Sequence, residues 1–208
     1  MNDLIRSLSL ALLFALSAPS LATAQETADG EAADEEVIDP LELSMGEDEG
    51  PAEDGPGSIY VLSEHTDWDI RCVRAAEGND PCQLYQLLTD QADNPVAEIN
   101  IFPLVGGETE AKAGATIVTP LETLLTAELG LQVDSGGVKK YPFSWCSAIG
   151  CFARLGFADE DIEAFKAGNV ARVIIVPVTA PDQRVSLEIS LAGFTAAFEQ
   201  AQDIANAE

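Results

Sequence analysis

The sequence predicts a mainly β protein: an antiparallel β-sandwich or barrel-like domain with two short helices, preceded by a signal peptide and a disordered acidic arm. Three observations indicate this fold class. Apolar and polar residues alternate in many short segments, turn-forming residues separate these segments, and four cysteines follow an N-terminus typical of exported proteins. The predicted organisation is a signal peptide at residues 1–24, an acidic linker at 25–57 and one β domain at 58–208.

The first 24 residues have the composition of a secretory signal peptide. Arg6 precedes an apolar run at residues 8–16, which is too short to span a bilayer as a helix. Small residues at 22–24 suit a signal peptidase, so we expect cleavage after about Ala24 and a mature chain that begins at Gln25. No later run is apolar for long enough to be a transmembrane helix, so no integral membrane segment is expected after cleavage. The predicted location is periplasmic or secreted.

The next segment, residues 25–57, contains thirteen acidic residues and no lysine or arginine, in a chain whose net charge is −26. It has few large apolar residues, so burial cannot offset the entropy lost on ordering, and a disordered arm is expected. A patch that binds Ca²⁺ or a basic partner is the alternative, but residues 47–50 lack the spacing of a calcium loop. A chain this acidic is repelled by nucleic acid and anionic membranes, so no nucleic-acid partner is predicted.

Period-two alternation predicts the strands of the domain. Residues 67–72 and 185–191 alternate between apolar and polar side chains, as in strands with one solvent-facing side. Residues 173–178 are apolar on both faces, which predicts a central strand that leaves its ladder at Pro177. Further strands are predicted at residues 59–62, 83–88, 97–104, 116–119, 129–133, 138–143 and 152–156.

Two short helices are predicted in the second half. Carboxylates at 159–161 suit the first turn of a helix, Phe157 and Ile162 are spaced for a hydrophobic staple, and Gly168 is expected to end the helix in a left-handed conformation. The second helix is expected to begin near Thr195, a candidate N-cap. Its apolar stripe is expected to dock on the sheet, with a partner-binding groove as the alternative: Phe194, Ala197, Phe198 and Ala201.

The four cysteines are predicted to form two structural disulfides. Cys146 and Cys151 flank a four-residue loop that can close a hairpin, and Cys72 and Cys82 bracket a polar, turn-forming segment. Near-neighbour pairing, 72–82 and 146–151, is therefore favoured among the three possible connectivities, although loop entropy alone does not select it. A thiol oxidoreductase typically has Cys-x-x-Cys, and zinc sites have short Cys-x₂-Cys knuckles; neither spacing is present. No metal or cofactor is predicted.

No catalytic residue is predicted. His65 is the only histidine and is expected at an exposed strand entry, and no Gly-x-Ser-x-Gly elbow or phosphate-binding glycine loop occurs. Helix capping explains the carboxylates at 159–161 more simply than acid–base chemistry. Trp68 and Trp145 are expected to pack against the disulfides, and Lys139 with Lys140 to be a solvated strand end.

Six segments stand in consistent order along the domain: WDIRC (68–72), PCQ (81–83), IFPL (101–104), GATIVTPL (114–121), YPFSWCSAIGCFARLG (141–156) and PDQRVSLEISLAGF (181–194). Together they resemble the invasion-associated locus B (IalB) proteins of alphaproteobacteria. The resemblance covers nearly all of residues 60–200 and does not include the acidic arm.

The resemblance implies an exported, envelope-associated protein, linked in some pathogens to entry into host cells. It implies no catalytic residue and no cofactor, and the only site residues that it transfers are the four cysteines, as structural bridges. We therefore expect a non-catalytic envelope protein that binds an unidentified envelope or host protein, or supports the envelope. The alternatives are a periplasmic enzyme, either a hydrolase centred on His65 or a thiol–disulfide exchanger, and a small-ligand carrier with a sandwich cavity.

Overall fold

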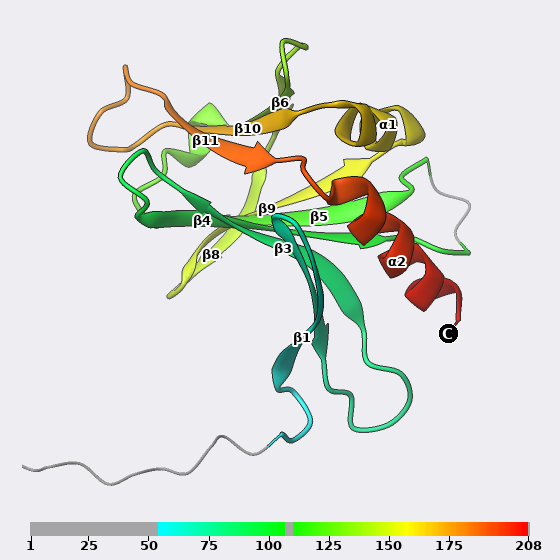
Figure 1. The fold of residues 1–208 in the computed structure, drawn as a ribbon. Coiled ribbons are helices and arrows are strands. Elements are labelled where there is room, and N and C mark those ends of the chain that lie inside the picture. Colours follow the sequence, from blue (N-terminus) through cyan, green and yellow to red (C-terminus); the bar gives the residue numbers. More distant parts are fainter. Residues whose placement is uncertain (1–53, 107–109, 208) are drawn as a thin grey trace, which may run out of the picture. The chain divides into compact units, whose positions relative to one another are not determined.

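The structure is a computed structural model that describes residues 54–106 and 110–207 (Figure 1). The predicted signal peptide (1–24) and all but the last four residues of the predicted arm (25–57) lie outside the described residues. The described end of the arm forms a turn against the domain. There the Gly57 amide donates to the Arg74 carbonyl at 2.8 Å, and Arg74 pairs with the Asp54 carboxylate at 3.6 Å.

The described residues form two antiparallel sheets and two α-helices. In chain order the elements are β1 (Ile59–His65), β2 (Trp68–Val73), β3 (Cys82–Thr89), β4 (Pro95–Pro103), β5 (Ala113–Thr119), a short 3₁₀ helix η1 (Leu125–Ala127), β6 (Leu129–Val133), β7 (Lys139–Tyr141), β8 (Phe143–Ser147), β9 (Gly150–Phe157), α1 (Asp159–Ala167), β10 (Val170–Ile175), β11 (Val185–Ser190) and α2 (Phe194–Asn206).

The larger sheet has the strand order β1-β2-β3-β4-β5-β9-β8, and the smaller one β11-β10-β6-β7. Each described sheet keeps two free edges, so neither closes into a barrel. The predicted antiparallel, β-rich class is confirmed. Alternation sets the faces as expected: in β2, Trp68, Ile70 and Cys72 are buried while the residues between them are half-buried.

The helices cover the inner face of the larger sheet. Figure 1 shows α2 in front of this sheet, where it contacts β1, β2, β3 and β4. The predicted apolar stripe of α2 is buried there: Phe194, Ala197, Phe198 and Ala201. Rings from four elements then form a continuous aromatic core, because Phe194 contacts both Trp68 and Phe165, and Phe165 contacts Phe157, with centroid separations of 5.2–5.5 Å. Each such contact contributes about 0.5–1.5 kcal/mol beyond area burial.

Two strand predictions differ from the structure at prolines. Residues 138–143 were predicted as one strand, but Pro142 lacks an amide hydrogen and separates β7 of the smaller sheet from β8 of the larger one. Residues 173–178 were predicted as a strand; β10 instead begins at Val170 and ends at Ile175. Pro177 lies outside that ladder, as expected, and its contact with Thr123 is an isolated bridge.

Two sequence-based predictions at the helix ends, the left-handed conformation of Gly168 and the N-cap role of Thr195, are wrong. Gly168 ends α1 in an extended conformation (φ −79°, ψ 170°) rather than a left-handed one. It is required for space, since a Cβ there would lie 2.9 Å from the Ala164 carbonyl and from Leu191 and Val133 side-chain atoms. The N-cap of α2 is Gly193, in a left-handed conformation, and not Thr195.

Candidate functional site

The two disulfides join cysteines that lie directly opposite each other on neighbouring strands. Cys72 on β2 is bonded to Cys82 on β3, and Cys146 on β8 to Cys151 on β9, so no cysteine is free. The second bridge closes a hairpin whose strands extend to Ser147 and Gly150, so its loop is shorter than the four residues expected. Cys72 and Cys151 are buried, whereas Cys146 is exposed on an edge strand.

His65 has a structural set of partners. It ends β1, where its Nε2 lies 2.5 Å from Gln200 Oε1 of α2, and Ser63 Oγ donates to the same oxygen at 2.9 Å. These bonds anchor β1 to α2.

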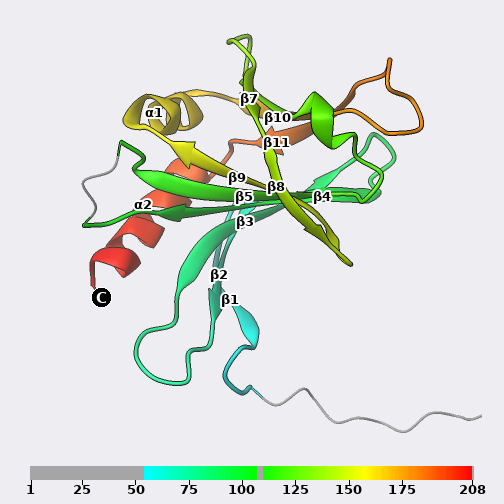
Figure 2. The ribbon, with the colours of Figure 1, turned by 180° about the vertical axis from the view of Figure 1, so that it is seen from behind.

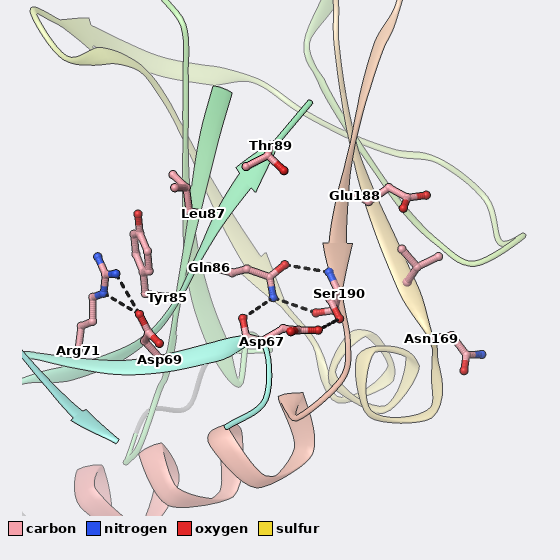
Figure 3. Close-up of a pocket in the computed structure, with 11 residues that line it drawn as sticks. Asp67, Asp69, Arg71, Tyr85, Gln86, Leu87, Thr89, Asn169, Glu188 and Ser190 are labelled. Atoms are coloured by element: carbon pink, nitrogen blue, oxygen red, sulfur yellow. Dashed lines mark hydrogen bonds and ion pairs between the residues drawn. The ribbon is translucent and has the colours of Figure 1, made fainter. Parts of the chain in front are cut away.

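An open cleft of about 510 Å³ lies between β2–β3 and β10–β11 (Figure 3). Its floor is the side chain of Gln86, which is 8% exposed. The Gln86 amide nitrogen donates to the carbonyls of Asp67 (2.9 Å) and Ser190 (3.1 Å), and its oxygen accepts from the Ser190 N–H at 2.8 Å. Gln86 thus bonds Ser190 as a neighbouring strand would, and joins the two sheets.

The charged groups of this cleft are already paired. Ser190 Oγ donates to Asp67, Arg71 pairs with Asp69 at 2.9 Å, and Arg172 pairs with Glu188 at 3.1 Å. Figure 3 shows the first two of these pairs on either side of Gln86. Because the Ser190 hydroxyl bonds a carboxylate and not a histidine, the cleft contains no activated nucleophile of the Ser-His type.

The Arg71 guanidinium in the same cleft also lies over the Tyr85 ring, 3.3 Å from its centroid. Burial, followed by the charge of Glu98, raises the pKa of Tyr85, so its hydroxyl stays protonated at neutral pH. Within the described residues no group of three or more potential ligands is placed to hold a metal ion.

The remaining predicted residues have ordinary structural partners. Asp161 accepts the Ala158 N–H at 3.1 Å, as expected for a residue in the first turn of α1, and also pairs with Lys139. Hydrogen bonding to Asp161 raises the pKa of Lys139. Lys140 donates to the Ala127 carbonyl at 2.9 Å. Trp68 packs on Phe194 in the core and donates its Nε1–H to the Ser190 carbonyl at 2.8 Å.

The outer face of the larger sheet carries an exposed apolar surface that was not predicted from the sequence. Figure 2 shows this side of the sheet, opposite α2. Trp145 on edge strand β8 stacks on Phe152 at 4.9 Å and is still 47% exposed. Ile149 at the hairpin tip is 77% exposed, and Leu87 on β3 is 48% exposed. We call Leu87, Trp145 and Ile149 the hairpin patch.

Strand register places Leu87 and Trp145 in one row of outward-facing side chains, which also includes the carboxylate of Glu98. Leu87 is paired with Glu98, Glu98 with Val118, Val118 with Phe152, and Phe152 with Trp145, so one row of side chains crosses five strands. Leu87 and Ile149 also line a common groove. Exposed apolar groups gathered in this way are typical of interaction sites. Apolar alternation along the chain does not reveal this surface, since it does not show which strands are neighbours.

The chain matches the family model described as invasion associated locus B (IalB) protein over residues 68–202. It is 27% identical over 148 residues to invasion protein B homologues of Brucella abortus, from strain 2308 and from biovar 1 strain 9-941; each match covers 71% of this chain and 83% of the relative. Invasion associated protein B from Bartonella henselae has a similar crystal structure, with a TM-score of 0.59 and 20% identity, covering 70% of this chain and 97% of that one. This structural likeness supports the fold.

Proposed function

The chain belongs to the invasion associated locus B (IalB) family, and from this premise we propose that it is an exported, non-catalytic protein of the bacterial envelope that acts by binding another protein. Its matched relatives are named as invasion proteins and not as enzymes. The two disulfides and these relatives are consistent with export. Among the described residues, no helix combines the length and apolar character needed to cross a bilayer. Host-cell entry is then a consequence of binding in lineages that infect cells.

The observation that carries the binding proposal is the hairpin patch. Trp145 lies on a free sheet edge, held in place by its stack on Phe152, and aromatic residues fixed in this way supply much of the binding energy of protein interfaces. The cleft at Gln86 offers no comparable surface, because its polar groups are bonded to one another. The expected partner is an envelope or host protein that buries Trp145 and Ile149.

The test replaces the patch with polar residues and measures binding to the partner. The Trp145→Ser, Ile149→Ser double variant is expected to lose at least about tenfold in affinity, since buried interface aromatics contribute about 2 kcal/mol or more. The matched control is Ile59→Ser, Val138→Ser, which alters two exposed apolar residues (66% and 45%), one on edge strand β1 at the opposite edge of the larger sheet from β8 and one beside β7 of the smaller sheet. Crosslinking in intact cells identifies the partner. An equal loss in the control, or unchanged binding in the patch variant, contradicts the proposal.

Export itself has a direct measurement. We propose that residues 1–24 are removed and that the mature chain begins at Gln25. The intact mass and N-terminal sequence of the protein recovered from the envelope fraction are expected to match that start. Recovery of the uncleaved chain from the cytosol is the contrary result.

Thiol–disulfide exchange is the second candidate, and one observation favours it: Cys146 is exposed on an edge strand. Exchange requires attack by a thiolate on an accessible sulfur. If this function holds, mild reductant opens the 146–151 bridge while the 72–82 bridge survives, and the protein reoxidises a test dithiol. Resistance of both bridges would exclude it.

A further inference from the structure

A slot of about 380 Å³ lies between α1 and the β6–β7 hairpin. The Gln86 cleft borders the β10–β11 side of the smaller sheet, and the slot borders its β6–β7 side. A volume of this size is within the range of small-molecule sites. We call it the α1 slot. Its apolar floor and back wall come from residues that belong to the core or border it: Leu131, Val133, Phe157 and Phe165.

Small residues keep the α1 slot open. The side of α1 that faces the hairpin presents Ala164, Ala167 and Gly168, and the hairpin turn contributes Gly136 and Gly137. These five residues carry at most a methyl side chain, so they leave the space between helix and hairpin unfilled. The core behind the slot is nevertheless tightly packed, because a Cβ at position 168 would already lie 2.9 Å from three neighbouring atoms. The slot is therefore an open space beside a well-packed core, which a ligand can enter without unfolding either element.

One polar group in the α1 slot has no hydrogen-bond partner among the described residues. The Tyr141 side chain is half-buried, and its hydroxyl makes no hydrogen bond to any other described residue. Burial, followed by the charge of Asp161, raises the pKa of Tyr141, so the group stays a neutral donor at physiological pH. A hydroxyl carried by a half-buried ring beside an apolar floor is the kind of single polar contact that orients a ligand in such a site.

The charges around the α1 slot select against anions. Of the described residues that line it, only Lys139 is basic, and its charge is already compensated by Asp161 at the slot and by Glu160 at 3.6 Å. Asp134 adds a further carboxylate, which accepts the Asn169 and Val170 amides. The balance is negative, so a carboxylate or phosphate on the ligand would be repelled.

We propose that the α1 slot binds a small neutral molecule with a flat or branched apolar body and one hydrogen-bond acceptor, a carbonyl oxygen that receives the Tyr141 hydroxyl proton. The apolar body contacts Val133, Ala164 and the ring of Tyr141, which are more accessible than the core residues behind them. This site is separate from the hairpin patch and goes beyond the proposed protein binding. It requires no chemical step in the ligand.

The first experiment compares three small probes on the isotopically labelled exported chain. Acetophenone is neutral with a carbonyl acceptor, benzoate has nearly the same shape with a negative charge, and toluene has no acceptor. Acetophenone is expected to shift the amide resonances of β6, β7 and α1, with an affinity at least about tenfold above that of benzoate. No shifts with acetophenone, or tighter binding of benzoate, would overturn the proposal.

Two variants then locate the site. Tyr141→Phe keeps the ring and removes the hydroxyl, so it is expected to weaken acetophenone binding about five- to tenfold and to leave toluene unchanged. Ala164→Leu is expected to fill the slot and abolish binding of both, whereas Ala196→Leu, at an exposed alanine of α2, preserves it. Equal binding by Tyr141→Phe and the unaltered chain would show that the hydroxyl does not act, whatever the folding of Ala164→Leu.

Discussion

At the scale of single residues, Gln86 carries the junction between the two sheets through three hydrogen bonds to backbone atoms. Alternation along β3 places position 86 on the same inward face as Leu84 and Leu88, so its burial follows from the sequence. The identity of its partner does not follow from the sequence, because Ser190 is 104 residues away and contributes only backbone groups to this contact. A buried amide of this kind specifies one packing of two elements, since any other leaves its polar atoms unbonded.

Gln86→Leu is expected to destabilise the protein by about 1–3 kcal/mol, because the Ser190 N–H is left without its partner in a buried junction. Urea unfolding of both chains measures the difference. Gln91→Leu, at an exposed residue of the β3–β4 turn, is the control and should stay within about 0.5 kcal/mol of the unaltered chain. Equal stabilities of the two variants would show that the junction contributes nothing.

Asp80 provides a pH dependence at the same scale. The Ala75 amide and the Tyr60 hydroxyl both donate to its carboxylate, at 2.8 and 2.9 Å, and lower its pKa below the ordinary value of 3.8. A lowered folded pKa gives a stabilisation that is complete above the unfolded value and is lost as the pH falls through the folded one. Asp80→Asn is therefore expected to be less stable than the unaltered chain at neutral pH, with the difference shrinking as the pH falls below the ordinary pKa of 3.8 and through the lowered folded pKa.

Unfolding curves across that pH range test the Asp80 prediction. The control is Asp182→Asn, which changes an exposed carboxylate with no hydrogen bond or ion pair to the described residues. A difference between Asp80→Asn and the unaltered chain that stays constant with pH would mean that the charged carboxylate is not the stabilising species.

At the scale of elements, the start of α2 depends on the backbone of a distant strand. Gly193 has φ +88°, and a Cβ on it would lie 2.0 Å from the His65 carbonyl oxygen. Capping preference selected Thr195, since hydroxyl residues favour helix N-termini. The close approach of β1 instead requires a residue without a side chain at the N-cap position, which is Gly193. Helix existence and the buried stripe could be predicted from periodicity, but this boundary depends on a contact that no local pattern shows.

Gly193→Ala is expected to cost about 2–3 kcal/mol, because the new methyl group meets a backbone carbonyl and requires a left-handed alanine. Gly137→Ala is the matched control: it has no atom within 4 Å of the new Cβ and no positive φ, so the stability should be unchanged or slightly higher. Thermal unfolding compares them. Similar melting temperatures would show that α2 does not dock as described.

The two cross-strand disulfides are expected to contribute unequally. The 72–82 bridge spans ten positions and the 146–151 bridge five, which in the chain-entropy model corresponds to about 2.7 and about 2.1 kcal/mol. Paired alanine substitutions, Cys72→Ala with Cys82→Ala and Cys146→Ala with Cys151→Ala, measure each contribution by urea unfolding. The first pair should cost more, also because Cys72 is fully buried. A more costly loss of the second pair would contradict this account.

At the scale of the whole molecule, the fold class followed from alternation, while the architecture depended on pairings between distant segments. The crossing from the smaller to the larger sheet at Pro142, and the free edges at β1 and β8, are properties of strand order. The hairpin patch follows from the same order, because one row of side chains crosses five strands. Cysteine pairing could be predicted from the sequence because it depends on local spacing. The interaction surface could not, because it depends on which strands are neighbours.

One measurement tests the central claim, that this is an exported β domain whose sulfurs are structural and whose activity lies in an exposed surface. Non-reducing peptide mapping by mass spectrometry would be applied to the protein recovered from the envelope of cells that produce it. The account predicts two linked peptide pairs, Cys72 with Cys82 and Cys146 with Cys151, and no bound metal. Four free thiols, or thiols that hold a metal ion, would contradict it.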